Sequence, residues 1–270
     1  MTAPAIVRLD APGRLALAAA LGESPATIMS CHRLRRGLAT AWALGDPAAP
    51  VAAIVQGTLL PADPHAHGED PAAIRELLRV VPGWSCVNAP EAVAAPLARL
   101  VERDAGSPCD GGPEIYSLQT TPADLPPHPV ARRLHPDHLP LLLAATGPLG
   151  MAGWRFGSAA ALLEEGIAAG IVVDGDLLAV AFTSALGTTH AEVGIVTRGD
   201  ARGRGYATAS AAIVCAALHA SGILPVWSTS PDNLPSRRVA AHLGFRDVSQ
   251  RQYICRPQAA GSITPAPVPG

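Results

Sequence analysis

Short apolar runs alternate with longer amphipathic stretches along the second half of the chain, a pattern typical of α/β folds. The stretch "GIVVDGDLLAVAFTSA" predicts two strands joined by a tight turn at 174–176, and "HAEVGIVT" predicts a third strand. Because a hairpin precedes the later alternation of strand and helix, we expect an α/β (α+β) fold. Its central sheet should be mixed, mostly antiparallel and flanked by helices.

Residues that start or stop helices mark the other elements of this half. Ser158 is the expected N-cap of a helix over 158–166, while Gly222 and Gly244 follow two later helices, within 206–220 and "NLPSRRVAAHLGF". The runs "PVWSTS" and "DVSQRQYIC" predict strands. The stretch "VARRLHPDHLPLLLAA" predicts a strand, a turn and a helix.

The N-terminal half shows a similar alternation with weaker boundaries. After a first Ala-rich helix, strands are predicted in "GLATAWAL", "PVAAIVQGTLL", "WSCVN" and "EIYSLQT", and helices in "DPAAIRELLRVV" and "APEAVAAPLARLVER". We interpret this half as a degenerate repeat of the second half. The Pro-rich break "TTPADLPPHP" separates an N-terminal α/β domain over 1–125 from a second domain over 130–256, and a Pro-rich, disordered tail over 257–270 follows.

Composition narrows the classes of partner. The formal net charge is −2, so we expect neither nucleic acid nor an anionic membrane surface as a partner. Apolar runs stay shorter than the roughly 18 residues that a membrane-spanning helix needs. The chain contains no lysine, which excludes a Walker-type phosphate loop because that loop requires one.

Cysteine and histidine spacing gives no sign of a metal site. The 5 cysteines are scattered without a C-x-x-C pair, so we expect no disulfide framework, no zinc site and a reducing, cytoplasmic location. His65 and His67 lie in a Pro/Gly-rich stretch beside acidic residues, and we interpret them as part of a solvated loop.

The segment "TRGDARGRGYAT" joins a predicted strand to a predicted helix and is a candidate anion site. Glycines let backbone N–H groups approach a phosphate at a helix N-terminus, and Arg202 and Arg204 could add charge-assisted hydrogen bonds. A turn with solvated arginines is the alternative for the loop taken alone. A Rossmann dinucleotide site is disfavoured because Thr208 replaces the last glycine and no acidic residue ends the next predicted strand.

Two motifs together resemble those of the GNAT superfamily of acyl-CoA-dependent N-acyltransferases. Arg202, Gly205 and Ala207 match the loop pattern Arg/Gln-x-x-Gly-x-Gly/Ala. Asn233, followed by a helix ending in Leu243-Gly244-Phe245, matches the second motif, with a helix and a strand between the two. The chain looks most like a subgroup with an extra, degenerate acetyltransferase-like N-terminal domain.

The resemblance, which covers residues 130–255, implies a site for acetyl-CoA and no metal. In the family the strand before the loop splays from its neighbour and pairs with the pantetheine arm, here through Ile195, Val196 and Thr197. The pyrophosphate would be bound by six consecutive loop residues, Arg202, Gly203, Arg204, Gly205, Tyr206 and Ala207. Asn233 and Ser236 would lie beside the pantetheine, although a plain helix cap is the alternative role for Asn233.

Acetylation of an alkylamine near neutral pH needs a group that accepts the amine proton. Glu192 is the candidate base, because it lies on the strand leading into the loop at a family-like distance from Arg202. The alternative is a carboxylate in solvent or paired with an arginine. Many relatives place a tyrosine acid seven residues after the asparagine, where this chain has Ala240; Ser236, a water or no residue at all could replace it.

We therefore expect an N-acetyltransferase that transfers an acetyl group from acetyl-CoA to a primary amine of a small molecule or peptide. Two alternatives stay open: a tandem-domain acyltransferase of the mycothiol-synthase kind, and a non-catalytic acyl-CoA-binding sensor. The lack of a glycine loop before residue 130 argues against the first, whereas Ala240 motivates the second. A homodimer is compatible with the sequence, which defines neither the oligomeric state nor the acceptor.

Overall fold

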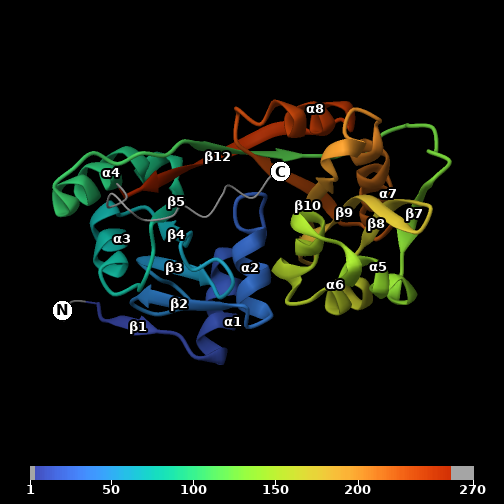
Figure 1. Ribbon diagram of the computed structural model, residues 1–270. Helices are drawn as coiled ribbons and strands as arrows, with labels where there is room; N and C mark the ends of the chain where they lie inside the picture. The colour runs from blue at the N-terminus through green and yellow to red at the C-terminus, as the bar shows by residue number, and fades with distance from the viewer. Residues whose placement is uncertain (1–3, 257–270) are drawn as a thin grey trace. The chain divides into compact units, whose positions relative to one another are not determined.

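A computed structural model describes residues 4–256 of the chain, which form two compact units (Figure 1). Among the described residues, the first unit contains 4–22, 30–115 and 249–256, and the second contains 23–29 and 116–248. These units differ from the predicted domains, which divide at 125–130: residues 23–29 and 116–125 belong to the second unit, and residues 249–256 belong to the first. The predicted tail at 257–270 lies outside the described residues.

The first unit is a mixed sheet with four helices. Its strands, in spatial order, are β1 (Ile6–Arg8), β2 (Ala39–Leu44), β3 (Ala52–Gly57), β4 (His65–Gly68), β5 (Cys86–Pro90) and, from residue 249 onward, β12 (Arg246–Cys255). Neighbours run antiparallel except β4 and β5, which are parallel. The helices are α1 (Ala11–Leu21), α2 (Ile28–Arg35) from residue 30 onward, α3 (Pro71–Leu78) and α4 (Glu91–Ala105).

Apolar residues at helical spacing explain how α3 and α4 pack in this unit. Ile74 and Leu77 of α3 share a buried cluster with Val93 and Leu97 of α4 and with residues of the sheet. Asp70 begins α3 by accepting a hydrogen bond from the backbone N–H of Ala72 at 2.8 Å. A carboxylate therefore occupies the N-terminus of α3.

The second unit contains the hairpin and the glycine loop that the sequence predicts. Its strands are β6 (Pro113–Leu118), β7 (Ala131–Leu134), β8 (Ala168–Val173), β9 (Asp176–Leu186), β10 (His190–Thr197) and β11 (Leu224–Thr229), in the spatial order β6-β11-β10-β9-β8-β7. Pairing is antiparallel from β7 to β10 and parallel between β10 and β11. Asp174 and Gly175 form the predicted turn, with φ of 51° and 86°.

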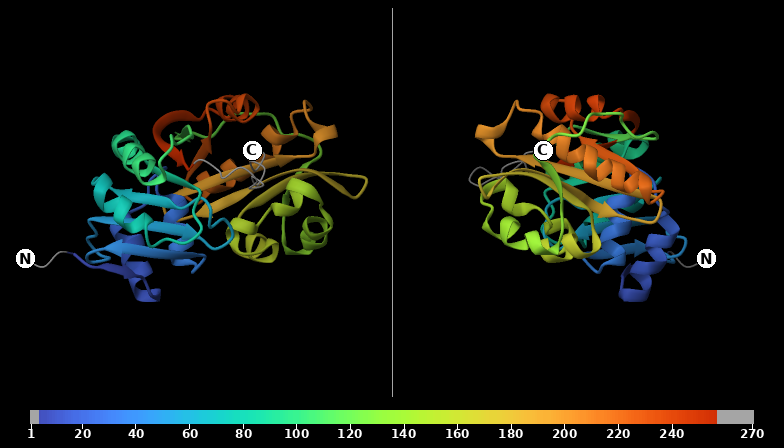
Figure 2. Two further views of the ribbon diagram at one scale, coloured as in Figure 1. Left: turned by 60° about the vertical axis from the view of Figure 1, so that its left-hand side comes forward. Right: turned by 90° about the vertical axis from the view of Figure 1, so that its right-hand side faces the viewer.

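Helices cover both faces of this second sheet. They are α5 (Leu139–Ala144), α6 (Ala159–Glu165), α7 (Tyr206–Ala220) and α8 (Leu234–His242), together with the 3₁₀ turns η1 (Pro136–His138), η2 (Gly147–Met151), η3 (Trp154–Phe156) and η4 (Gly199–Ala201). Helices α7 and α8 pack on one face and α5 and α6 on the other (Figure 2). Ser158 caps α6 through the backbone N–H of Ala161, as predicted.

The two units have the same order of elements along the chain. Each begins with one strand and two helices, continues with three strands and a helix, and ends with a strand and a helix. The first unit runs β1-α1-α2-β2-β3-β4-α3-β5-α4, and the second runs β7-α5-α6-β8-β9-β10-α7-β11-α8. In each unit a parallel pair of strands flanks the third helix of the series.

Two sequence-based expectations for the first unit are wrong. The expectation of no disulfide fails because Cys86 and Cys255 are directly opposite each other on antiparallel strands β5 and β12 and form a disulfide. The two cysteines are 169 residues apart, so their spacing in the sequence did not indicate the pairing. This bond removes the cysteine argument for a reducing compartment. His65 and His67 belong to the buried strand β4, not to a solvated loop. Among residues 4–256, no helix is long and apolar enough to cross a membrane.

Candidate active site

The parallel pair β10 and β11 separates part of the way along its length. Register between the two strands ends where Glu192 is opposite Val226. Beyond that point β10 continues to Thr197 and stays paired with β9 alone, so among the described residues its other edge carries no strand. Backbone N–H and C=O groups on such an edge can pair with an extended ligand.

Ile195, Val196 and Thr197 lie on this separated part of β10. They are opposite Ala181, Val180 and Ala179 of β9, respectively. The hydroxyl of Thr197 is buried and has no hydrogen-bond partner among the described residues. A buried hydroxyl without a partner is costly, so a polar ligand on this edge would satisfy it.

Glu192 is buried at the point where the strands separate. Its side chain is only 7% exposed. The hydroxyl of Ser228, on β11, donates a hydrogen bond to Glu192 Oε1, and Arg155 Nη1 lies 4.0 Å from the same oxygen. The carboxylate is therefore held between two strands and lies within reach of one guanidinium. Its buried position suits a general base, and its arginine neighbour agrees with the alternative role of a carboxylate paired with an arginine.

Glu192 points to one defined face of the sheet, next to a bulge in the neighbouring strand β9. The register shifts between Glu192, opposite Ala185, and Val193, opposite Thr183, so that Ser184 is the extra residue. Ala185 packs with Val226 in a cluster away from α7, whereas Val193 packs with α7. Glu192 is thus on the sheet face opposite α7 and α8.

The glycine loop joins β10 to α7 through η4. Gly203 and Gly205 both have φ of 77°, a left-handed conformation that favours glycine, and a Cβ on either would meet open space. Gly205 is the N-cap residue of α7, and no side chain caps that helix start. Arg202, Gly203, Arg204 and Gly205 are exposed, while Tyr206 and Ala207 are half-buried.

Charge within the loop is partly balanced. Arg198 donates hydrogen bonds to Asp200 at 2.7 Å and to Asp176 at 3.2 Å. The bond from Arg198 holds the pKa of Asp200 below its usual range. Arg204 donates a longer bond, 3.4 Å, to the backbone carbonyl of Asp200. The acidic residue of the loop is thus paired, and the helix start next to it can accept an anion.

Helix α8 uses its predicted site residues partly for its own structure. The side chain of Asn233 accepts a hydrogen bond from the backbone N–H of Ser236 at 3.3 Å, which makes Asn233 the N-cap of α8. The Ser236 hydroxyl is buried and accepts the indole N–H of Trp227 at 2.9 Å. Both residues therefore have structural bonds, and Ser236 keeps its hydroxyl proton for another acceptor.

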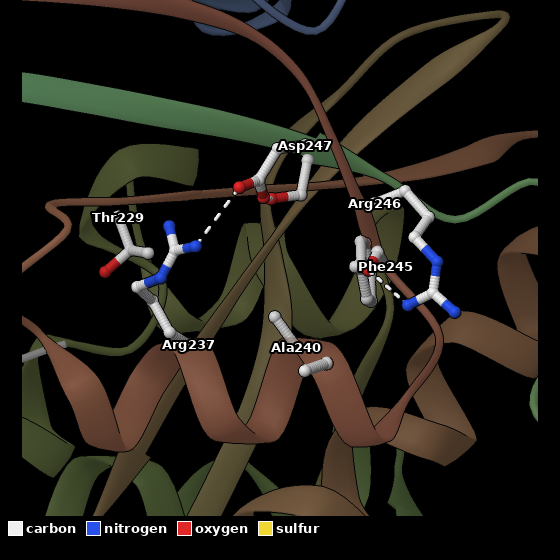
Figure 3. A pocket seen from close by; sticks show the side chains of 8 residues that line it. Thr229, Arg237, Ala240, Phe245, Arg246 and Asp247 are labelled. Carbon is white, nitrogen blue, oxygen red and sulfur yellow. Dashed lines mark hydrogen bonds and ion pairs between the residues drawn. The ribbon is translucent and has the colours of Figure 1, made fainter.

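Ala240 lies on the wall of a cavity of about 250 Å³ between α8, the end of β11 and the start of β12. Figure 3 shows Arg237 and Ala240 projecting from α8 toward this cavity, with Asp247 across from them. Asp247 accepts hydrogen bonds from Ser117 at 2.7 Å and from Arg237 at 3.1 Å, and these lower its pKa. The space that a tyrosine at position 240 would enter is therefore open and polar.

Comparison with known proteins agrees with this geometry. Residues 154–254 match the family model described as GNAT acetyltransferase. A GCN5-related N-acetyltransferase-like protein from Streptococcus suis is similar in structure, with a TM-score of 0.64 and 20% identity over 91% of this chain and 99% of that one. A tandem GNAT protein from the clavulanic acid biosynthesis pathway has a TM-score of 0.55 and 14% identity, covering 93% and 97%.

A putative GNAT acetyltransferase from Novosphingobium aromaticivorans has a TM-score of 0.51 and 24% identity over 74% of this chain and 86% of that one. No curated protein matches the chain in sequence. The fold is that of GNAT acyltransferases, with a mixed, mostly antiparallel sheet flanked by helices. The match to the GNAT acetyltransferase family model covers residues 154–254, and the likeness to solved structures over most of the chain shows the fold.

The structure brings together residues that lie far apart in the sequence. Ser228 and Arg155 both contact Glu192, yet they are 36 and 37 positions from it in opposite directions along the chain. The unusual "GWRFG" segment around Arg155 is the one local signal, since glycines on both sides mark a tight turn.

Proposed function

We propose that the second unit transfers an acetyl group from acetyl-CoA to a primary amine, with Glu192 as the general base. The observation that supports this most directly is the buried carboxylate of Glu192 at the point where β10 and β11 separate. A donor that lies along the free edge of β10 would bring its thioester close to this carboxylate. The acceptor is a small-molecule or peptide amine.

The residues of the second unit fit the parts of coenzyme A. The free edge of β10 at 195–197 would pair with the pantetheine amides, and the Thr197 hydroxyl would gain a partner there. The uncapped start of α7 and the two glycines would receive the pyrophosphate. Arg202 and Arg204 would add positive charge, whereas Asn233 and Ser236 would contact the pantetheine from α8.

The proposed reaction is direct attack. Glu192 accepts a proton from the ammonium form of the acceptor, and the neutral nitrogen forms a bond to the thioester carbon. In the tetrahedral intermediate the nitrogen carries a positive charge and loses a second proton to solvent. Collapse of the intermediate then breaks the carbon–sulfur bond, and the sulfur leaves with the electron pair as the thiolate of coenzyme A. Ser236 retains a hydroxyl proton that could reach this thiolate, and solvent in the cavity beside Ala240 is the other source.

Two other functions are disfavoured by specific features. Donor binding by both units, as in a tandem enzyme, conflicts with Asp70, whose carboxylate occupies the N-terminus of α3 where a phosphate would need to bind. A sensor without catalysis would have no need of a buried carboxylate at the separation point of the strands. The proposed donor is an intracellular metabolite, so we also propose a cytoplasmic enzyme.

Replacement of Glu192 by Gln tests the proposal. The change keeps the size of the side chain and its bond with Ser228, but removes the base. We expect turnover of acetyl-CoA with an amine panel to fall by roughly 10²–10⁴, while acetyl-CoA affinity measured by calorimetry stays the same. Unchanged turnover at every pH would reject Glu192 as the base, and a wild type that binds acetyl-CoA but acetylates no amine would favour the sensor.

A further inference from the structure

Among the described residues, Arg155 is the basic residue that forms an ion pair with Glu192, the proposed base. Its Nη1 lies 4.0 Å from Oε1 of Glu192. The Arg155 side chain is 37% exposed, in contrast to the 7% of Glu192. The guanidinium therefore lies on the solvent side of the carboxylate, where an acceptor must approach.

The turn that carries Arg155 fixes the position of its backbone. Gly153 has φ of 93°, and a Cβ there would meet backbone atoms of Ala159 at 2.7 Å, so only glycine fits. Phe156 is fully buried, and its backbone N–H donates to the Gly153 carbonyl at 2.8 Å. The backbone of Arg155 is thus held by a turn anchored on both sides, and its side chain extends from this turn to within 4.0 Å of Glu192.

Charge then discriminates between classes of amine. Alkylamines are mostly protonated at neutral pH, and a second ammonium group near Arg155 would be repelled. A carboxylate near Arg155 would instead gain charge-assisted hydrogen bonds, which a guanidinium can make in bidentate form. An acceptor with both an amine and a carboxylate would therefore place its positive group opposite Glu192 and its negative group opposite Arg155.

We propose that the acceptor is an aminocarboxylate, bound with its amine on Glu192 and its carboxylate on Arg155. In an α-amino acid both groups are attached to one carbon, so they can reach two partners that lie 4.0 Å apart. This inference rests on the proposed function and adds the class of acceptor. Arg155 acts in it as a specificity-determining residue, because it contacts the acceptor but transfers no proton.

Matched acceptor pairs test the inference on the full-length wild type. Each pair consists of an amino acid and the amine that lacks only its carboxylate, such as L-phenylalanine with phenethylamine and L-lysine with cadaverine. We expect kcat/KM for the aminocarboxylate to exceed that of its partner by roughly tenfold to a hundredfold. Equal values within every pair, or a preference for the amine without a carboxylate, would overturn the inference and leave the proposed function intact.

Substitutions of Arg155 provide the second arm. Arg155→Glu should reverse the order, with the L-phenylalanine rate lowered and the cadaverine rate raised, while Arg155→Lys should keep the wild-type order. Arg132→Glu is the matched control, because this exposed arginine lies on β7, three strands from β10. A decrease of the same size for both members of each pair in Arg155→Glu would contradict the assigned role.

Binding separates the inference from the proposed function. In the presence of coenzyme A, calorimetry should detect L-phenylalanine binding to the wild type and at least tenfold weaker binding to Arg155→Glu. This result without turnover of any amine would support the inferred acceptor class and count against the acetyltransferase proposal. Equal binding of L-phenylalanine and phenethylamine by the wild type would overturn the inference whatever the turnover.

Discussion

The two units follow the same order of elements but differ at the start of the helix that follows the third strand of the series. In the second unit, α7 begins at Gly205 with no side-chain cap and two glycines in left-handed conformation before it. In the first unit, α3 begins at Asp70, whose carboxylate accepts the backbone N–H of Ala72. The same helix start is thus open to an anion in one unit and occupied by a carboxylate in the other.

The parallel strands next to these helices differ in the same sense. In the first unit, the buried guanidinium of Arg251 donates to the backbone carbonyl of Ala66 on β4 at 2.5 Å and to that of Asn88 on β5 at 2.9 Å. Arg251 also donates to the Asn88 side chain. In the second unit the Ser228 hydroxyl on β11 donates to the Glu192 carboxylate on β10, and beyond Glu192 β10 keeps a free edge.

This difference shows how one arrangement of elements can serve two purposes. The groups that the second unit leaves available for a ligand are satisfied internally in the first unit, by Asp70 at the helix and by Arg251 between the strands. Since buried polar groups must find partners, internal satisfaction stabilises the first unit and removes its capacity to bind a cofactor in this way. We therefore expect the proposed donor to bind to the second unit alone.

The largest expected effect comes from removing the bridge in the first unit. Arg251→Met would leave two buried carbonyls and the Asn88 side chain without their donor, at a cost of roughly 3–5 kcal/mol in the free energy of unfolding. Urea denaturation measures this cost. Arg246→Met, on the exposed start of the same strand, should cost about 0.5 kcal/mol or less. Equal decreases in the free energy of unfolding for both variants would show that the hydrogen bonds of Arg251 do not stabilise the first unit.

The second largest effect comes from making α7 resemble α3. Gly205→Asp places a carboxylate at the helix start, in a left-handed conformation that Asp tolerates better than most residues. Repulsion of the pyrophosphate should weaken acetyl-CoA binding roughly hundredfold in calorimetry, which is about 2.7 kcal/mol.

Gly205→Asn has the same size without the charge and should lose much less affinity. Asp70→Asn in the first unit should leave acetyl-CoA binding as it is in the wild type. If Gly205→Asp and Gly205→Asn bind acetyl-CoA equally well, charge at the start of α7 is unimportant.

A smaller effect concerns the pH dependence of the first unit. Burial, and then the charge of Arg251, hold the pKa of His67 well below its usual range, and His67 shares a hydrogen bond with buried Ser30 at 2.9 Å. The unfolded chain binds a proton that the folded chain does not, so stability should fall as pH decreases below about 6.5, by up to about 1.4 kcal/mol per pH unit.

Denaturant unfolding at several pH values between 7.5 and 5 would measure this slope. His67→Gln should flatten this slope relative to the wild type. An identical slope in wild type and His67→Gln would show that His67 does not titrate as described.

The smallest effect concerns the reactivity of the cysteine thiols in the two units. Denatured protein kept free of reductant should expose 3 reactive thiols, from Cys31, Cys109 and Cys215, because Cys86 and Cys255 are bonded. In native protein Cys215 of the second unit should not react, since burial raises its pKa to about 12. A titration with a coloured disulfide reagent counts the thiols, and 5 in the unreduced denatured chain would contradict the bond.

Local patterns in the sequence were sufficient for most elements of the second unit. The Asp174–Asp176 turn, the Ser158 cap and the long helix after Gly205 each have a short-range chemical signal, and the structure confirms all three. In the first unit, β4 was missed because "HAHG" lacks the β-branched residues that mark a strand, and its burial depends on neighbours distant in sequence.

The candidate site shows the same limit. Glu192 and the loop residues follow from motifs that are continuous in sequence. The contacts of Glu192 with Arg155 and Ser228, the bulge at Ser184 and the bridge by Arg251 depend on which strands become neighbours. Pairing across long separations leaves no local trace, so these features could be found only in the folded chain.

Titration of full-length protein with acetyl-CoA tests most directly whether only the second unit binds the donor. Calorimetry should give one equivalent bound per chain, and Gly205→Asp should weaken that single event without revealing another. Two equivalents per chain would contradict the account, because the first unit would then also bind the donor despite Asp70 and Arg251. No binding at all would contradict it equally, since the open helix start and the free strand edge would then have no such ligand.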